Sequence, residues 1–390
     1  MKLLFVSNLF PDRREIQRGL DNAQLLKHLA SACSIRVVAP RPRLPWSRRA
    51  TPEPRGEDAA FCPVFPPAWY LPKVGSRVNH LLLAGALRGP IADLRRQGLF
   101  EMALVSWLYP DGCAVARLAR EMGFPFVLVA QGSDVHQYLR NSVRRRLILE
   151  AIRRSGAVIC RSADLARLLR EAGAESGKLE IGYNGVDTKL FHPADKAGVR
   201  RRLGLPEEAF IVAQVGNLLP IKNPLLSVEA FGILRRRGLA RPARLVFVGD
   251  GPLRAAVEES ARRLGLSGAV MLTGRLPDYQ VAAYLQAADT LCLSSWNEGL
   301  PNVILEALAA GLPVVATRVG GISEVVNGPP LGRLVAPGDA AELADALAQT
   351  MQNVPPAEAL VDFAQRFSWE RTAQIYLQIL RRAGDGRSQS

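Results

Sequence analysis

Short runs of β-branched and leucine-rich residues alternate with longer segments of helical periodicity along nearly the whole chain. Each run has the length of a buried strand, and the longer segments, 225–237 for example, repeat apolar residues at a spacing of three and four. Strands that alternate with helices form parallel sheets that are covered on both faces. The runs are 3–6, 35–39, 102–106, 126–130 and 157–160 in the first half, and 211–216, 244–248, 270–272, 290–293 and 314–317 in the second.

The two groups of runs predict an α/β protein with two doubly wound domains, since 390 residues exceed what one core usually holds. The predicted domains are 1–185 and 186–365, separated near the turn signal Asn-Gly, and a last helical segment covers 366–390. Residues 44–72 are rich in proline and arginine and predict a long loop. Ligands bind at the carboxyl ends of the strands in such sheets, so we expect a site in a cleft between the two domains.

Cysteine and histidine usage excludes several classes of protein. The five cysteines are scattered without a Cys-x-x-Cys pair and the four histidines are dispersed, which argues against a disulfide framework and a zinc site and favours the cytoplasm. The start of the chain, MKLLFVSNLFP, has an apolar core of only 3–6 and no small-residue cleavage site after it. It therefore predicts a first buried strand rather than a secretion signal.

The net charge of +14 is unevenly distributed along the chain. Residues 1–185 carry 28 lysines and arginines against 16 acidic residues, whereas the remainder carries 22 against 20. A basic half leaves an anionic membrane, a phosphate-bearing lipid and nucleic acid open as partners, beside the alternative of an ordinary solvated surface. Nucleic acid is not expected, because no aromatic-interleaved basic motif or known binding module is present.

The stretch SWNEGLPNVILEALAAG, 295–311, places two carboxylates in apolar surroundings. A proline suits the first turn of a helix and a glycine ends one, so Glu298 is expected in a loop and Glu306 inside a mostly buried helix. A buried carboxylate needs hydrogen-bond donors, which ribose hydroxyl groups would supply, and the free N–H groups at the helix start suit a phosphate. Alternatively, Glu298 is a helix-start carboxylate and Glu306 an ion-paired structural residue.

Two glycine-containing loops support a sugar-nucleotide site in the second domain. VGNLLPIK follows a strand directly, so Gly216 allows close approach of the backbone and Lys222 can meet a phosphate as a point charge. GDGP, 249–252, also follows a strand, although it lacks the third glycine of the dinucleotide fingerprint.

Together these residues resemble the family 4 glycosyltransferases, whose GT-B fold consists of two Rossmann-like domains facing a central cleft. The segment 298–306 matches the E-x7-E motif of that family, and VGNLLPIK, GDGPL, TGR, YNGVDTKLF and FSWE match further blocks. In the first half, SNLFPDRREIQRG, YPDG and QGSDV are most similar to the teichuronic-acid or exopolysaccharide type of these enzymes.

The resemblance implies a metal-independent, retaining transfer of a hexose-type sugar from a nucleotide-diphosphate sugar to a glycan or polyprenyl-diphosphate-linked acceptor in cell-surface polysaccharide biosynthesis. It implies that Glu306 holds the ribose, that Glu298 lies beside the donor sugar, and that Lys222 neutralises the leaving diphosphate. It also implies that the last helix returns to the first domain. The other implied donor contacts are Gly19 from the first domain and Gly216, Arg275, Leu276, Gly299, Leu300, Pro301 and Asn302 from the second.

Two positions depart from the pattern of the family. Asn217 stands where many members have arginine, and Gln131 where many have histidine. Both amides can still donate hydrogen bonds, so both remain candidates for the catalytic site. Neither a cofactor nor a metal is expected, and no Asp-x-Asp occurs in the chain.

Other functions remain open beside a transferase. An epimerase or hydrolase on the same fold would turn over the donor without an acceptor, and a catalytically silent member would only bind the nucleotide. The first domain is the acceptor side in this fold, and its arginines are expected to attract a polyprenyl-diphosphate acceptor or the inner face of the membrane. These arginines are Arg41, Arg43, Arg48, Arg49, Arg144, Arg145, Arg146, Arg153 and Arg154.

Overall fold

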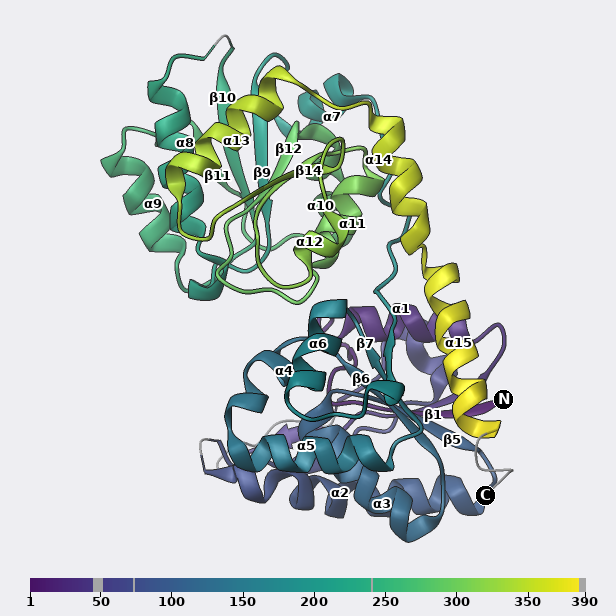
Figure 1. Ribbon diagram of the computed structural model, residues 1–390. Coiled ribbons are helices and arrows are strands. Elements are labelled where there is room, and N and C mark those ends of the chain that lie inside the picture. The colour runs from purple at the N-terminus through teal and green to yellow at the C-terminus, as the bar shows by residue number, and fades with distance from the viewer. Residues whose placement is uncertain (45–51, 73, 240, 386–390) are drawn as a thin grey trace. The chain divides into compact units, whose positions relative to one another are not determined.

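The computed structural model describes residues 1–44, 52–72, 74–239 and 241–385. The chain divides into two compact units. The first unit comprises Met1–Asn184 and the chain from Trp369 onward, and the second comprises Gly185–Ser368. Each contains a six-stranded parallel sheet with helices on both faces (Figure 1), so the predicted class of two doubly wound α/β domains is confirmed.

The second unit has the strand order of a dinucleotide-binding domain. Its sheet runs β11-β10-β9-β12-β13-β14, which is 3-2-1-4-5-6 when its strands are numbered along the chain. The order reverses between β9 and β12, and ligands bind at that switch point in open α/β sheets. The strands are β9 (Phe210–Val215), β10 (Ala243–Val248), β11 (Val270–Leu272), β12 (Thr290–Leu293), β13 (Val314–Thr317) and β14 (Gly332–Val335).

Alternate residues of β9 supply two separate cores, because successive side chains of a strand point to opposite faces of the sheet. Phe210 and Val212 pack with α8, α9 and α13, whereas Ile211 and Ala213 pack with α7, α10, α11 and α14. Burial on both faces explains the nearly continuous apolar runs. The helices are α7 (Lys196–Leu203), α8 (Pro224–Arg236), α9 (Arg254–Arg263), α10 (Asp278–Ala287), α11 (Asn302–Ala309), α12 (Ile322–Val325), α13 (Ala340–Gln352) and α14 (Ala357–Ala364).

The sheet of the first unit has the order β2-β1-β5-β6-β7-β8 and its switch point lies between β1 and β5. The expected first strand is confirmed as β1, whose residues Leu3–Val6 are fully buried. The prediction of a long loop over 44–72 is partly wrong, because the short strand β4 lies within this range and pairs with β3 in a separate two-stranded sheet. The strands are β1 (Lys2–Val6), β2 (Ser34–Val38), β3 (Arg41–Arg43), β4 (Pro67–Trp69), β5 (Met102–Ser106), β6 (Phe126–Ala130), β7 (Ala157–Cys160) and β8 (Leu179–Ile181).

The last helix of the chain, α15, completes one core of the first unit. Its buried residues Tyr376 and Leu380 pack in one cluster with Leu3 and Phe5 of β1, and the ring of Trp369 stacks on a histidine of α1 with 6.1 Å between centroids. No helix of the described part of the chain is long and apolar enough to cross a membrane. The helices of this unit are α1 (Leu20–Leu29), α2 (Asn79–Arg96), α3 (Cys113–Met122), α4 (Ser133–His136), α5 (Ser142–Arg154), α6 (Ala163–Glu171) and α15 (Trp369–Asp385).

Candidate functional site

Loops at the carboxyl ends of the strands interlock along one edge of the second unit's sheet. A Cβ atom on Gly249, which has φ +145°, would lie 2.0 Å from the carbonyl oxygen of Gly216. A Cβ atom on Gly320, which has φ +52°, would lie 1.8 Å from the carbonyl oxygen of Glu298. Only glycine permits these approaches together with these backbone conformations, so the loops after β9 and β10 and those after β12 and β13 are held backbone against backbone.

Glu298 and Lys222 form an ion pair at this edge. The lysine Nζ lies 2.6 and 2.7 Å from the two carboxylate oxygens, and Ser295 Oγ donates a further hydrogen bond of 2.6 Å to Glu298. The carboxylate side chain is 8% exposed and the lysine side chain 30% exposed. Pairing offsets the cost of removing the carboxylate from water, and the ammonium group retains a third N–H.

The two loops that carry this pair are also joined by other hydrogen bonds. Ser294 Oγ donates to the backbone oxygen of Asn223 at 2.7 Å, and the backbone N–H of Trp296 donates to the oxygen of Ile221 at 2.8 Å. These bonds fix the 3₁₀ turn Pro220–Lys222 against the loop after β12. The backbone on both sides of the Lys222–Glu298 pair is therefore fixed by hydrogen bonds, so the pair does not depend on side-chain rotamers alone.

Helix α11 begins directly after Pro301, and this places Glu306 in its second turn. The neighbours Ile304 and Leu305 are fully buried, whereas Glu306 is half-buried. The backbone N–H of Gly321 donates to the oxygen of Gly299 at 2.6 Å and holds the approach to this helix against the loop after β13. The segment Gly299, Leu300, Pro301 and Asn302 thus leads from the ion pair to the start of the helix.

The remaining candidates of the second unit lie in loops at the same edge. Gly216 and Asn217 are exposed and follow β9, and the next residue, Leu218, donates to the oxygen of Asp250 at 3.0 Å. The N–H of Gly249 donates to the oxygen of Gly274 at 2.9 Å. That bond brings the loop before the exposed Arg275 and the half-buried Leu276 beside the loop after β10.

Two predicted residues, Gly19 and Gln131, belong to the first unit. Gly19 immediately precedes α1, and Gln131 immediately follows β6. The amide of Gln131 is used inside the unit: its Nε2 donates to Asn22 Oδ1 at 3.1 Å and its Oε1 accepts from Arg161 Nη1 at 3.1 Å. Ser106 Oγ also accepts from this amide.

Apart from Gln131, the members of this polar network were not predicted from the sequence. Arg161 is 5% exposed, and its Nη2 donates to Asn22 Oδ1 at 2.8 Å. Ser106 is the last residue of β5, and Arg161 is the first residue after β7. A polar residue at the carboxyl end of a predicted strand was therefore the signal that could have identified both.

Asp111 is a buried carboxyl group near the switch point of the first unit. It is fully buried and accepts from Asn8, at 2.6 Å from the backbone N–H and at 2.8 Å from Nδ2. Burial raises the pKa of the Asp111 carboxyl to about 7, while the hydrogen bonds from Asn8 and the charge of Arg18 act in the opposite direction. As the pH rises, the folded protein thus keeps a proton on Asp111 that the unfolded chain, with an aspartate pKa of about 4, releases at a lower pH.

The free energy of unfolding is therefore expected to fall as the pH rises from about 4 to about 7, because only the unfolded state ionises in that window. Asp111→Asn should flatten this slope, with an upper bound of about 4 kcal/mol on the change across the window. The measurement is urea unfolding of both proteins at a series of pH values. Equal slopes in the two proteins would show that Asp111 is not protonated in the fold.

Among the described residues, no group of three or more histidine, cysteine, aspartate or glutamate side chains is placed to hold a metal ion. The expectation that the protein uses no metal ion stays a prediction.

Two protein-family models match the chain. The model of glycosyltransferase family 4 matches residues 22–190, and the model of glycosyl transferases group 1 matches residues 195–367. The boundary between the two matches lies close to the division between the first and second units.

Curated relatives are similar to different shares of the chain. A D-inositol 3-phosphate glycosyltransferase of Kribbella flavida is 36% identical over 222 residues, which are 54% of this chain and 52% of that protein. The putative teichuronic acid biosynthesis glycosyltransferase TuaC of Bacillus subtilis is 28% identical over 362 residues, which are 89% of this chain and 88% of that protein. The chain thus spans about half the length of the first relative and most of the second.

Solved structures share the fold over nearly the whole chain. HepE of Anabaena in complex with UDP superposes with a TM-score of 0.77 at 20% identity, covering 98% of this chain and 100% of that one. Sucrose-phosphate synthase of Thermosynechococcus elongatus gives a TM-score of 0.75 at 20% identity and covers 98% of each chain. At such identities the likeness concerns the fold alone.

Proposed function

The chain belongs to the family 4 glycosyltransferases of the GT-B fold, and from this premise we propose that it transfers a hexose-type sugar with retention of anomeric configuration. The donor is a nucleotide-diphosphate sugar, and the acceptor is a glycan or a lipid-linked glycan of the cell surface. The observation that carries the proposal is the Lys222–Glu298 pair at the carboxyl edge of a sheet with the strand order of a dinucleotide-binding domain.

Each group at this edge has a chemical task in the proposed reaction. The third N–H of Lys222 and the N–H groups at the start of α11 stabilise the negative charge that grows on the leaving diphosphate. Glu306 accepts hydrogen bonds from the ribose hydroxyl groups. The acceptor hydroxyl attacks from the face that the diphosphate leaves, and the departing phosphate takes the proton.

UDP is the first nucleotide to test, because HepE, which shares the fold, was solved in complex with UDP. We expect one nucleoside diphosphate among UDP, GDP, ADP and dTDP to raise the free energy of unfolding by ~2.7 kcal/mol at about a hundred times its dissociation constant. Glu306→Ala should remove most of that increase, since it removes the carboxylate that is proposed to accept hydrogen bonds from the ribose. Thermal unfolding at several nucleotide concentrations measures both effects.

Glu259→Ala is the matched control, because Glu259 lies on α9 with a side chain 63% exposed. It should leave the nucleotide effect unchanged. If no nucleotide stabilised the wild-type protein, the proposed donor site would be wrong.

The same purified protein distinguishes the alternatives. Donor consumed only when an acceptor is present supports a transferase, whereas consumption without acceptor identifies an epimerase or hydrolase. The anomeric configuration of the product, read by NMR, tests retention. Activity that EDTA abolishes and manganese restores would overturn the proposed metal independence.

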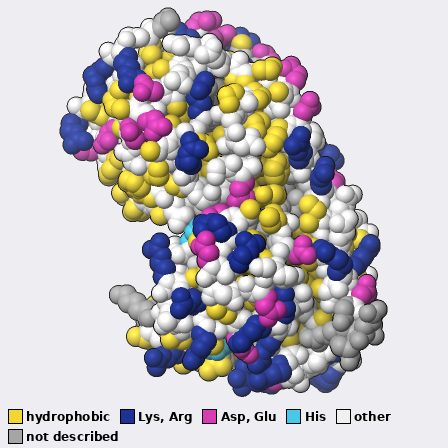
Figure 2. Space-filling view, viewed as in Figure 1, with side chains coloured by type: hydrophobic (Ala, Val, Ile, Leu, Met, Phe, Trp, Pro, Cys, Tyr) yellow, Lys and Arg dark blue, Asp and Glu magenta, His cyan; other side chains and the backbone are white. Residues whose placement is uncertain are grey.

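Several arginines that were expected to face a membrane are engaged within the first unit. Arg41 pairs with Asp12, and both Arg153 and Arg154 pair with Glu150. On the face drawn in Figure 2, lysine and arginine side chains are interspersed with acidic ones rather than gathered into one continuous patch.

We propose a cytoplasmic protein with peripheral membrane attachment, supported by Arg145 and Arg146, which are exposed on α5. Arg48 and Arg49, also expected to contribute, lie outside the described residues. Sedimentation with anionic vesicles at low salt tests the attachment, and failure to bind would refute it.

A further inference from the structure

Two adjoining cavities lie at the carboxyl edge of the first unit's sheet, beside the switch point between β1 and β5. The smaller, of about 200 Å³, has an aromatic wall and a few polar groups; the larger, of about 650 Å³, is lined by arginines. Pro42 and Tyr70 line both cavities. The aromatic cavity is lined among others by Trp69, Trp107, Tyr138, Asn8 and Asp111, and the arginine cavity by Arg14, Arg18, Arg41, Arg43, Asp12 and Glu15.

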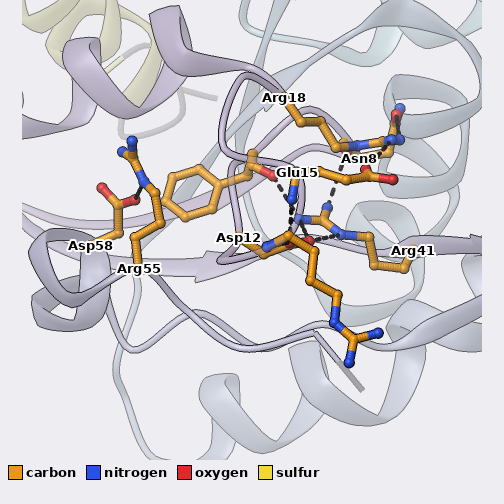
Figure 3. Close-up of polar contacts among 9 residues, drawn as sticks. Asn8, Asp12, Glu15, Arg18, Arg41, Arg55 and Asp58 are labelled. Carbon is orange, nitrogen blue, oxygen red and sulfur yellow. Dashed lines mark hydrogen bonds and ion pairs between the residues drawn. The ribbon is translucent and has the colours of Figure 1, made fainter. Parts of the chain in front are cut away.

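Two of these arginines are fixed in place by the chain itself (Figure 3). Arg41 Nη2 lies 2.9 Å from Asp12 Oδ2, and its side chain is 11% exposed. Arg18 Nε donates to the backbone oxygen of Asn8 at 2.7 Å, and its Nη1 lies 2.8 Å from Glu15 Oε2. Burial and then the nearby charge of Arg18 lower the pKa of Arg41, so two guanidinium groups repel each other across a partly dry site.

The other two arginines supply uncompensated charge. Arg14 and Arg43 are exposed, and within the described ranges no carboxylate forms an ion pair with either. Arg43 lies over the ring of Trp69, with 5.3 Å between its guanidinium carbon and the ring centroid, where the two cavities meet. Four guanidinium groups against two carboxylates leave the cavity positive, and the planar guanidinium group matches phosphate and carboxylate.

The aromatic cavity also contains a strained residue. Trp107, directly after β5, has φ +93°, which a non-glycine residue rarely adopts. Its N–H donates to the oxygen of Val129 at 3.0 Å, and the next N–H donates to Asp134 at 3.0 Å, so the conformation is held from both sides. Backbone strain of this kind clusters at ligand sites, and an aromatic wall with a few polar groups is the usual lining of a small-molecule site.

We propose that the two cavities bind an anionic acceptor. Its phosphate or carboxylate group lies among Arg14, Arg18, Arg41 and Arg43, and its uncharged ring lies against Trp69 and Trp107. The inference rests on the proposed transferase function, to which it adds the place where the anionic group of the acceptor is held and the residues that select it.

The test measures binding of pyrophosphate, glucuronic acid and neutral glucose at constant ionic strength, with hydrogen–deuterium exchange to locate each probe. We expect an anionic probe to protect 12–18 and 41–44, and glucose to bind much more weakly. The double variant Arg14→Gln/Arg43→Gln should weaken the anion by roughly tenfold or more, the factor for lost hydrogen bonds to a charged group. Preference for pyrophosphate or for glucuronic acid then tells a phosphate-bearing from a carboxylate-bearing acceptor.

Arg96→Gln/Arg120→Gln is the charge-matched control, because Arg96 on α2 and Arg120 on α3 are exposed and neither lines either cavity. If this variant weakened anion binding equally, the effect would be general electrostatic attraction and the proposal would be overturned. Protection from exchange by the anion that is confined to 216–222 and 298–306 would also overturn it. UDP tested in the same exchange experiment reports on those two segments. Intact nucleotide protection without an anion effect in the first unit would refute the acceptor inference alone.

Discussion

Replacing Glu298 with glutamine is expected to lower the turnover number for sugar transfer by roughly a hundredfold or more. The amide would no longer balance the charge of Lys222, and its single oxygen could accept only one of the two hydrogen bonds that now hold the lysine at 2.6 and 2.7 Å. Lys222→Gln should have an effect of similar size, because it removes the cation proposed to stabilise the leaving diphosphate. Initial rates with the donor identified by the nucleotide screen give the comparison.

Measuring the free energy of unfolding distinguishes a loss of turnover in these variants from a loss of folded protein. Because the lysine side chain is 30% exposed, breaking the pair should cost only about 1–2 kcal/mol of unfolding free energy. Glu259→Gln, an exposed site on α9, should retain the wild-type rate. Rates near that of the wild-type protein in both Glu298→Gln and Lys222→Gln would refute the assignment of the site.

Gly320→Ala is expected to damage the same site through the backbone alone. The added Cβ would meet the carbonyl oxygen of Glu298 at 1.8 Å, so the loop that carries this carboxylate must move. We expect the second unit to lose about 2–4 kcal/mol of unfolding free energy and the transfer rate to fall with it. Chemical denaturation and initial rates measure the two effects.

Gly265→Ala is a control for the backbone conformation. Gly265 has φ +69°, similar to the +52° of Gly320, but no atom of the described residues lies within 4 Å of the position its Cβ would take. It should cost only about 1 kcal/mol, so the difference between the two variants isolates the collision with Glu298. Equal costs would show that the loop after β13 does not fix the position of Glu298.

The sequence allowed the sheets to be predicted because their strands are buried on both faces. The expected strand 211–216 is observed as Phe210–Val215, and the expected strand 102–106 is observed at the same residues. Strand β4 was missed, since it has only three residues and begins with a proline, which is rare inside a strand. Periodicity therefore identified the central strands, but it missed β8 and β14 at the ends of the two sheets and the short pair that borders the cavities of the first unit.

The candidate site was predictable only in part. The residue types around Glu298 and Lys222 indicated a phosphate and ribose site. The two residues are 76 positions apart, however, and no local sequence pattern predicts their contact. The network of Asn22, Gln131 and Arg161 was not foreseen for the same reason, because it joins loops whose proximity depends on strand order. Strand order is a property of the whole sheet rather than of any segment.

The return of α15 to the first unit has a consequence for the order in which the chain matures during synthesis. The second unit is continuous, so it can fold as soon as Ser368 has left the ribosome. The first unit cannot complete its core until Trp369, Tyr376 and Leu380 have been made, although most of its residues emerge first. The first half of the protein therefore keeps an open apolar face on its sheet until α15 has been translated.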